Sequence, residues 1–92
     1  MKFVAKIVDN KLEIKNASKE PVFVTAVYVK FRVYVKSEEL IGVEAIRNLT
    51  EEYDINRIIT DNFYIPIPYK DVAEVQIKYR KNNEIELEKI EL

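Results

Sequence analysis

The stretch "PVFVTAVYVKFRVYVK", residues 21–36, decides the fold, because it contains no turn signal between its proline and its last lysine. Its odd-numbered positions are nearly all apolar, which is the two-residue period of a β-strand with a buried face. Its even-numbered positions are apolar only as far as Ala26, and the later ones are Tyr28, Lys30, Arg32, Tyr34 and Lys36. We therefore expect a strand that is covered on both faces before Ala26 and has one solvated face from Tyr28 onward.

The predicted strand is too long for a compact domain of this size. Fifteen residues of β-strand extend for about 50 Å. A compact domain of 92 residues has a diameter of roughly 32 Å. The strand must therefore bend, switch sheets or protrude from the body, and we place the change between Ala26 and Tyr28.

The N-terminal segment predicts a β-hairpin whose turn is formed by Asp9 and Asn10. A two-residue loop sets opposite one another the pairs Val8 and Lys11, Ile7 and Leu12, Ala5 and Ile14, and Lys6 and Glu13. Apolar residues then face apolar residues and a cation faces an anion, so the register is self-consistent.

The C-terminal segment predicts a second hairpin. A two-residue loop would place Tyr79 opposite Glu86 and Ile77 opposite Glu88, and would bury charge. A three-residue loop at residues 81–83 avoids this, because it pairs Tyr79 with Ile85 and Ile77 with Leu87. After Leu87 the apolar phase slips to Ile90, which predicts a β-bulge near Glu88 and Lys89.

The middle of the chain is less clearly patterned. "NFYIPIPY", residues 62–69, predicts an edge strand with Phe63, Ile65 and Ile67 inward, because its two prolines cannot donate to a neighbouring strand. Residues 37–62 fit a helix through Ile41, Ala45, Leu49 and Tyr53, or a strand through Ile41, Val43 and Ala45. We favour a strand near 40–46, a loop or a single helical turn from Thr50, and a strand from about 57.

One motif resembles a known family. "DVAEVQI", residues 71–77, is similar to the D-x-A-x-Y-x-C pattern of immunoglobulin domains. Asp71 and Ala73 match, whereas Val75 stands at the tyrosine and Ile77 at the cysteine. With short strands and a hairpin at each end, the chain resembles an immunoglobulin-like or fibronectin type III-like β-sandwich. This implies a single all-β domain over residues 1–92, an antiparallel sandwich of about seven strands with at most one short helical turn near 50–57.

The composition argues against catalysis. The chain has no histidine and no cysteine, and so lacks the commonest general base and the commonest metal ligands. Ser18 and Ser37 have no partner for a nucleophilic triad, and one glycine excludes a phosphate-binding loop. "EEYDIN", residues 51–56, offers oxygen ligands for calcium but fits a plain acidic loop better. We expect no enzyme, no catalytic residues, no metal and no cofactor.

Five residues on one face of the long strand are the candidate binding set: Tyr28, Lys30, Arg32, Tyr34 and Lys36. Such a face can stack bases and neutralise phosphates. The same pattern also fits a half-buried strand whose tyrosines and cations simply face solvent. The net charge of −1 favours this alternative. We expect a non-enzymatic interaction or structural module that binds protein partners through a sheet edge or face. A nucleic-acid-binding accessory protein is the alternative.

A homodimer is one form of this interaction. Two of the predicted edge strands carry residues that hinder pairing with another chain. The closing strand has glutamates at 84, 86 and 88, and the strand at 63–69 has two prolines. The remaining edge lies beside residues 30–36 or on the strand that follows. The apolar face formed by Val29, Phe31, Val33 and Val35 needs cover, which either the second sheet of the same chain or a second copy provides. A two-fold pairing at this edge would cover the ribbon.

Two further features bear on location and source. Asn16 in "NAS" and Asn48 in "NLT" are glycosylation sequons if the protein is exported. "MKFVAKIVDN" lacks the apolar core of a signal peptide, so the cytoplasm is the default expectation, and the cell surface if the chain is an ectodomain. The excess of lysine and glutamate over glutamine and cysteine points to a thermophilic archaeon or its virus, or to an AT-rich genome.

Overall fold

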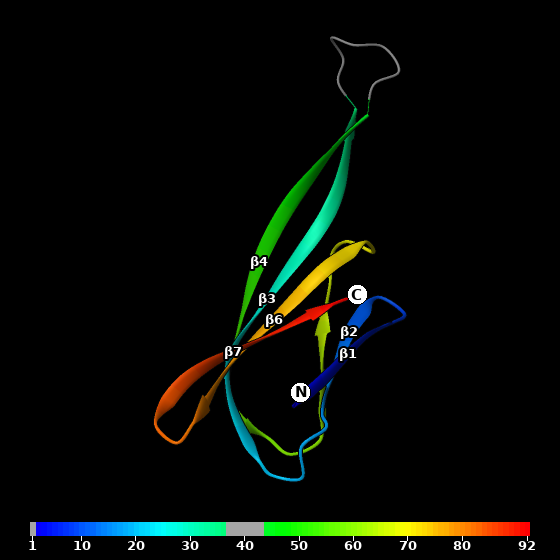
Figure 1. Ribbon diagram of the computed structural model, residues 1–92. Helices are drawn as coiled ribbons and strands as arrows, with labels where there is room; N and C mark the ends of the chain where they lie inside the picture. Colours follow the sequence, from blue (N-terminus) through cyan, green and yellow to red (C-terminus); the bar gives the residue numbers. More distant parts are fainter. Residues whose placement is uncertain (1, 37–43) are drawn as a thin grey trace.

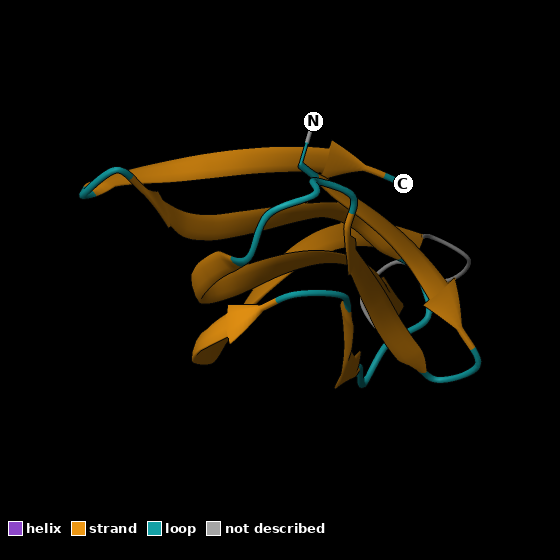
Figure 2. Cartoon of the chain, turned by 90° about the horizontal axis from the view of Figure 1, so that it is seen from below, coloured by secondary structure: helices purple, strands orange, loops and turns teal. Residues whose placement is uncertain are grey.

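The computed structural model describes residues 2–36 and 44–92 and shows two antiparallel β-sheets (Figure 1). The strands are β1 (Phe3–Val8), β2 (Lys11–Asn16), β3 (Val22–Lys36), β4 (Glu44–Ile59), β5 (Asn62–Pro66), β6 (Val72–Lys81) and β7 (Glu84–Glu91). One sheet has the order β1-β2-β5 and the other β4-β3-β6-β7. The described chain consists of strands and loops without a helix (Figure 2), which confirms the predicted all-β sandwich class.

The two sheets share one hydrophobic core. The three-stranded sheet contributes Phe3, Leu12, Ile14, Phe63 and Ile65, and the four-stranded sheet contributes Val24, Val27, Val29, Phe31, Val75 and Ile77. These residues recur at every second position of most strands, because successive side chains of a strand point to opposite faces. We call the face of the four-stranded sheet toward this core its inner face, and the opposite one its outer face.

The N-terminal hairpin has the predicted register. Ala5 pairs with Ile14, Ile7 with Leu12, and Val8 with Lys11. Asp9 has a φ of 55°, the left-handed conformation that Asp tolerates in a tight turn. Lys6 and Glu13 form an ion pair of 3.7 Å, as the charge pattern indicates.

The predicted register of the C-terminal hairpin is wrong. Tyr79 pairs with Glu86 and Ile77 with Glu88, and the pairing continues without a shift, so there is no bulge near Glu88. The turn is the two-residue loop Asn82 and Asn83, whose φ angles are 51° and 66°. Two successive positive φ angles define the hairpin turn that best matches the twist of the strands.

Glutamates are tolerated on the inner face of β7 because the second sheet covers only part of it. Glu86 is exposed beyond that sheet. Glu88 accepts hydrogen bonds from the backbone N–H groups of Lys2 and Phe3, at 2.7 and 2.9 Å. Ile85 and Leu87 lie on the outer face, 60% and 61% exposed. The irregular spacing of apolar residues after Leu87 therefore does not reflect an inserted residue. Ile90 lies on the inner face of β7, whereas Ile85 and Leu87 lie on its outer face.

Strand β3 both bends and protrudes. Its register shifts between Val24 and Ala26 against both neighbours, slightly before the predicted position. Such bulges bend a strand and increase its twist. Pairing with β6 ends at Phe31, whereas pairing with β4 continues to Lys36. Residues 32–36 and 44–48 thus form a two-stranded β3–β4 ribbon that extends beyond the rest of the molecule (Figure 1).

Strand β4 corrects the expectation for residues 50–57. Instead of a loop or helical turn followed by a new strand, β4 is one strand of 16 residues. Backbone pairing with β3 along its whole length holds it extended. Its single irregularity lies at Ile55 and Asn56, where Asn56 has a φ of 49°. The strand expected at 40–46 falls partly on residues 40–43, outside the described residues.

Strand β5 lies at a sheet edge, as its prolines predict. Within residues 2–36 and 44–92 it pairs with β2 alone, and Phe63 and Ile65 are each 4% exposed. Ile67, just after the strand, is also buried. No helix in the described ranges has the length and apolar character needed to cross a membrane.

Candidate functional site

The candidate binding set lies along the outer face of β3. Tyr28, Lys30 and Arg32 alternate with core residues of the same strand and therefore point away from the core. Tyr34 continues this row onto the ribbon, where it is 59% exposed. Lys36 pairs with Glu44 in the backbone register, and its side chain is outside the described part of the chain.

Tyr28 and Lys30 each face a carboxylate. Tyr28 lies opposite Glu52 of β4, and a hydrogen bond to that carboxylate is the main reason that the pKa of Tyr28 is raised. The Nζ atom of Lys30 lies 3.7 Å from Glu74 Oε2.

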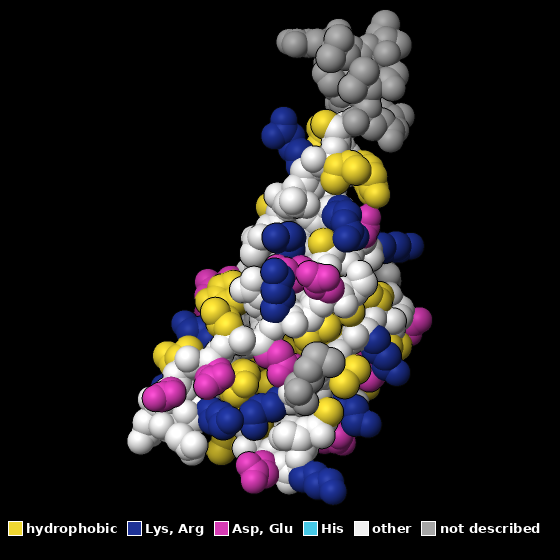
Figure 3. All heavy atoms as spheres, viewed as in Figure 1, with side chains coloured by type: hydrophobic (Ala, Val, Ile, Leu, Met, Phe, Trp, Pro, Cys, Tyr) yellow, Lys and Arg dark blue, Asp and Glu magenta, His cyan; other side chains and the backbone are white. Residues whose placement is uncertain are grey.

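Arg32 and Tyr34 share the carboxylate of Asp71. The guanidinium of Arg32 donates to Asp71 Oδ1 at 2.8 Å, and the hydroxyl of Tyr34 donates to Oδ2 at 3.1 Å. Three carboxylates therefore face the four described members of the set. This geometry favours a mixed-charge ladder over a phosphate-binding surface. Figure 3 shows basic and acidic side chains interspersed over the face of the molecule in view.

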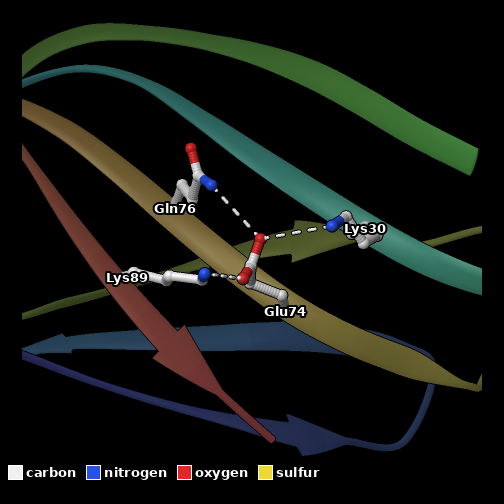
Figure 4. Close-up of polar contacts among 4 residues, drawn as sticks. All are labelled: Lys30, Glu74, Gln76 and Lys89. Atoms are coloured by element: carbon white, nitrogen blue, oxygen red, sulfur yellow. Dashed lines mark hydrogen bonds and ion pairs between the residues drawn. The ribbon is translucent and has the colours of Figure 1, made fainter.

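Glu74 is the centre of a four-residue polar cluster (Figure 4). It is only 8% exposed, and its Oε1 lies 2.9 Å from Lys89 Nζ. Its Oε2 accepts a hydrogen bond from Gln76 Nε2 at 3.2 Å and lies near Lys30. The pKa of Glu74 is lowered, mainly by its hydrogen bond with Lys89. This interaction outweighs burial, which by itself would raise the pKa. The cluster joins β3, β6 and β7.

A concavity of 320 Å³ lies beside this cluster on the outer face. Its lining residues are Tyr28, Lys30, Thr50, Glu74, Gln76, Lys78 and Leu87. Within this concavity, Glu74 accepts a hydrogen bond from Gln76 and forms an ion pair with Lys30. The polar groups of these three residues therefore interact with one another and do not present an open site to a ligand. We assign this cluster a structural role.

The two sequons have different surroundings. Asn16 is 5% exposed, and its Nδ2 donates to the carbonyl oxygens of Glu20 and Ile59, both at 2.9 Å. Its Oδ1 accepts hydrogen bonds from Ser18. The atom that a glycan would join is thus occupied in the folded chain. Asn48 is exposed on β4.

The acidic residues do not assemble a metal site in the described ranges. "EEYDIN" lies within β4 and not in a loop, so its successive side chains alternate between the two faces. Across residues 2–36 and 44–92, no group of three or more histidine, cysteine, aspartate or glutamate side chains could hold a metal ion. Ser37 and the acidic pair at 38 and 39 are outside these ranges.

The open edge of the four-stranded sheet is formed by β4. The sequence predicted an open edge near residues 30–36 but not the residues that form it. Among the described strands, β4 pairs with β3 alone and is the longest of the four edge strands. Residues 45–50 contain a single charge, Arg47. Ile46 and Leu49 are 60% and 37% exposed, and Val35 beside them is 40% exposed. Apolar side chains gather along the upper part of the ribbon in Figure 3.

The expected need to cover the inner face of β3 is largely met within the chain. Val29 and Phe31 are fully buried in the core, and Phe31 also contacts Tyr69 edge to face, with ring centroids 5.3 Å apart. Val33 is partly buried against the same core. Only the end of the ribbon, at Val35, leaves this face exposed.

Comparisons with protein-family models, with curated proteins and with solved structures find no match to this chain.

Proposed function

We propose that the protein is a non-enzymatic interaction module that binds protein partners by adding a strand to the open edge of β4. One side of β4 is paired along 16 residues, and the other side has no neighbouring strand in the described chain. Every second residue of such an edge directs its backbone N–H and C=O groups outward. These groups are a template for an extended segment of another chain.

The contrast among the edges supports this proposal most directly. Proteins block sheet edges with charge, proline, bulges or short length. β5 ends in Pro66, β1 has six residues, and β7 carries four glutamates in eight residues. β4 has a bulge only at Ile55 and Asn56, which leaves residues 44–54 regular. β4 is thus the least protected edge.

We also propose that the fold is immunoglobulin-like. In that fold strands B and E share one sheet, and strand C lies beside F in the other. Here β2 pairs with β5, and β3 lies between β4 and β6. The motif beginning at Asp71 enters β6, which corresponds to strand F. Such sandwiches have many functions, so this likeness supports only the position of β4 as an outer strand.

A peptide selection tests the edge-binding proposal. We expect a library of short linear peptides to yield binders with alternating apolar and polar residues, whose affinity is lost in Leu49→Lys. An inward-pointing lysine is a natural block to strand addition. Leu87→Lys is the matched control, since Leu87 is exposed on the opposite edge strand of the same sheet.

The selection has two outcomes that would overturn the proposal. One is the absence of enriched peptides. The other is a set of peptides that bind Leu49→Lys as well as they bind the unmodified protein.

The alternative proposal, nucleic-acid binding, rests on the row of Tyr28, Lys30, Arg32 and Tyr34 on one face. An electrophoretic shift at low salt, with single-stranded and duplex probes, tests it. Phosphate contacts would weaken steeply as salt rises. A shift that disappears in Lys30→Gln and Arg32→Gln would favour this alternative, and no shift at low salt would remove it.

A further inference from the structure

We infer that the strand added to β4 is β4 of a second copy, paired antiparallel over residues 44–54 about a two-fold axis at Leu49. This inference rests on the proposed function and names its partner. The result is one continuous eight-stranded sheet, because each copy contributes a sheet of four strands that ends in β4. A two-fold pairing uses the same edge on both copies and leaves neither edge open.

The geometry of antiparallel strands restricts the possible registers. Residues directly opposite one another in antiparallel strands lie on the same face of the sheet. The two-fold axis must therefore pass through a residue position and not between two positions. A shift of one residue would direct apolar side chains to the wrong face.

The inner face of β4 is self-complementary about Leu49. Arg47, Leu49 and Glu51 lie on this face, opposite Val33, Phe31 and Val29 of β3. With the axis at Leu49, Arg47 of each copy lies opposite Glu51 of the other, and the two leucines meet at the centre. Arg47 and Glu51 take part in none of the ion pairs formed within the described chain.

Neighbouring registers lack this complementarity. An axis at Asn48 sets Arg47 opposite Leu49 and Ala45 opposite Glu51. An axis at Thr50 sets Leu49 opposite Glu51. On the outer face, the Leu49 axis places Ile46 opposite Glu52, a pairing that is neither complementary nor repulsive. At the two ends of the interface it sets Glu44 opposite Asp54, and this like-charged pair opposes association. The charges of the inner face therefore select the axis at Leu49.

The same register covers the exposed apolar end of the ribbon. Ala45 of one copy lies opposite Tyr53 of the other, whose ring is half-buried on the inner face. Val35 pairs with Ala45 within each copy and lies beside this contact. The pairing ends after Asp54, where the bulge at Asn56 interrupts the regular edge. Eleven residue pairs form roughly ten hydrogen bonds between the copies.

Charge reversal tests both the partner and the register. In sedimentation velocity over a concentration series, we expect the unmodified protein to form dimers. Arg47→Glu and Glu51→Arg should each weaken self-association at least about tenfold, because each places two like-charged pairs across the interface. An equimolar mixture of the two variants should restore dimers, since both cross-strand pairs then have opposite charges.

The controls separate folding from association. Glu52→Arg introduces the same change of charge on the outer face of β4 and should leave dimers largely intact. Circular dichroism shows whether each variant is folded, and the double variant R47E/E51R, which restores both pairs in one chain, should dimerise if a single variant does not fold.

Two results would overturn the inference. The first is a monomeric unmodified protein at millimolar concentration. The second is a mixture of the single variants that stays monomeric although both are folded. In either case, peptides from the selection that bind the edge of β4 would still support the proposed function. If no such peptides are found, both the proposed function and the self-pairing are contradicted.

Discussion

Asn16 and Glu74 show how single polar residues are accommodated at buried positions. They are the buried polar side chains among the described residues. Asn16 bonds to the carbonyl oxygens of Glu20 and Ile59, and so ties the end of β2 to the end of β4. Glu74 is held by two lysines and a glutamine. Neither role is visible in the sequence, because each depends on partners that folding brings from distant positions.

Replacing Asn16 by alanine should destabilise the protein, since it removes the side-chain donor to the buried carbonyl group of Ile59. We expect the free energy of unfolding to fall by about 1–3 kcal/mol in chemical denaturation. Asn48→Ala is the matched control at the other sequon. It removes an exposed amide and should change that free energy by no more than about 0.5 kcal/mol. Equal effects of the two variants would contradict the structural role of Asn16.

The Glu74 cluster predicts a dependence of stability on pH. The pKa of Glu74 is lowered from its ordinary value of 4.5. A lowered pKa means that Glu74 contributes stability above the pKa of the unfolded chain, and that this stability is lost as pH falls through the pKa of the folded chain. In thermal unfolding, Glu74→Gln should lower the melting temperature near neutral pH and flatten its acid dependence. Glu84→Gln, at an exposed position of β7, should retain the acid dependence of the unmodified protein.

At the scale of the elements, the two hairpins show what a sequence pattern can and cannot predict. The register of β1 and β2 was predictable, because apolar and charged pairs agreed on a single answer. The register of β6 and β7 was not. The pattern does not reveal that Glu86 lies beyond the cover of the second sheet, or that Glu88 receives two backbone hydrogen bonds. Whether a strand face is buried depends on the opposing sheet.

Strand β4 illustrates the same limit. Its central residues have no clear two-residue period on their own, and the presence of β3 alongside keeps them extended. Tyr28, Lys30, Arg32 and Tyr34 lie on the face of β3 away from the core, as their alternation with apolar residues predicts. Their acidic partners come mainly from β4, β6 and the loop before β6, which the sequence could not place.

The hydrogen bonds of Glu88 predict how β1 is held to the four-stranded sheet. Its carboxylate accepts the N–H group of Phe3, and hydrogen bonds to charged groups are among the stronger ones in proteins. Glu88→Ala should accelerate hydrogen exchange of the Phe3 amide roughly 5–10-fold. Glu86→Ala, two residues earlier on the same face, should leave this exchange unchanged. An unaltered Phe3 amide in Glu88→Ala would show that β1 is held by core packing alone.

At the scale of the whole molecule, the chain is less compact than its length requires. The radius of gyration is 15.5 Å, whereas a compact domain of this length has about 12 Å. The β3–β4 ribbon accounts for much of this extension (Figure 1). The sequence predicted that the long strand must bend, switch sheets or protrude, and also that an edge near it would be open. It did not predict which residues form that edge, because the assignment of residues 50–57 was wrong.

The pairing of β4 with β4 of a second copy is tested most directly by cysteine cross-linking, because the chain has no cysteine of its own. In the proposed register, the Cα atoms of the two Leu49 residues lie about 4.5–5.5 Å apart, within the range that a disulfide spans. Leu49→Cys should therefore form a covalent dimer under mild oxidation. Ile46 is more exposed than Leu49, but in Ile46→Cys the two cysteines would lie about 20 Å apart and should not cross-link. Efficient cross-linking of Ile46→Cys, or none of folded Leu49→Cys, would contradict the account.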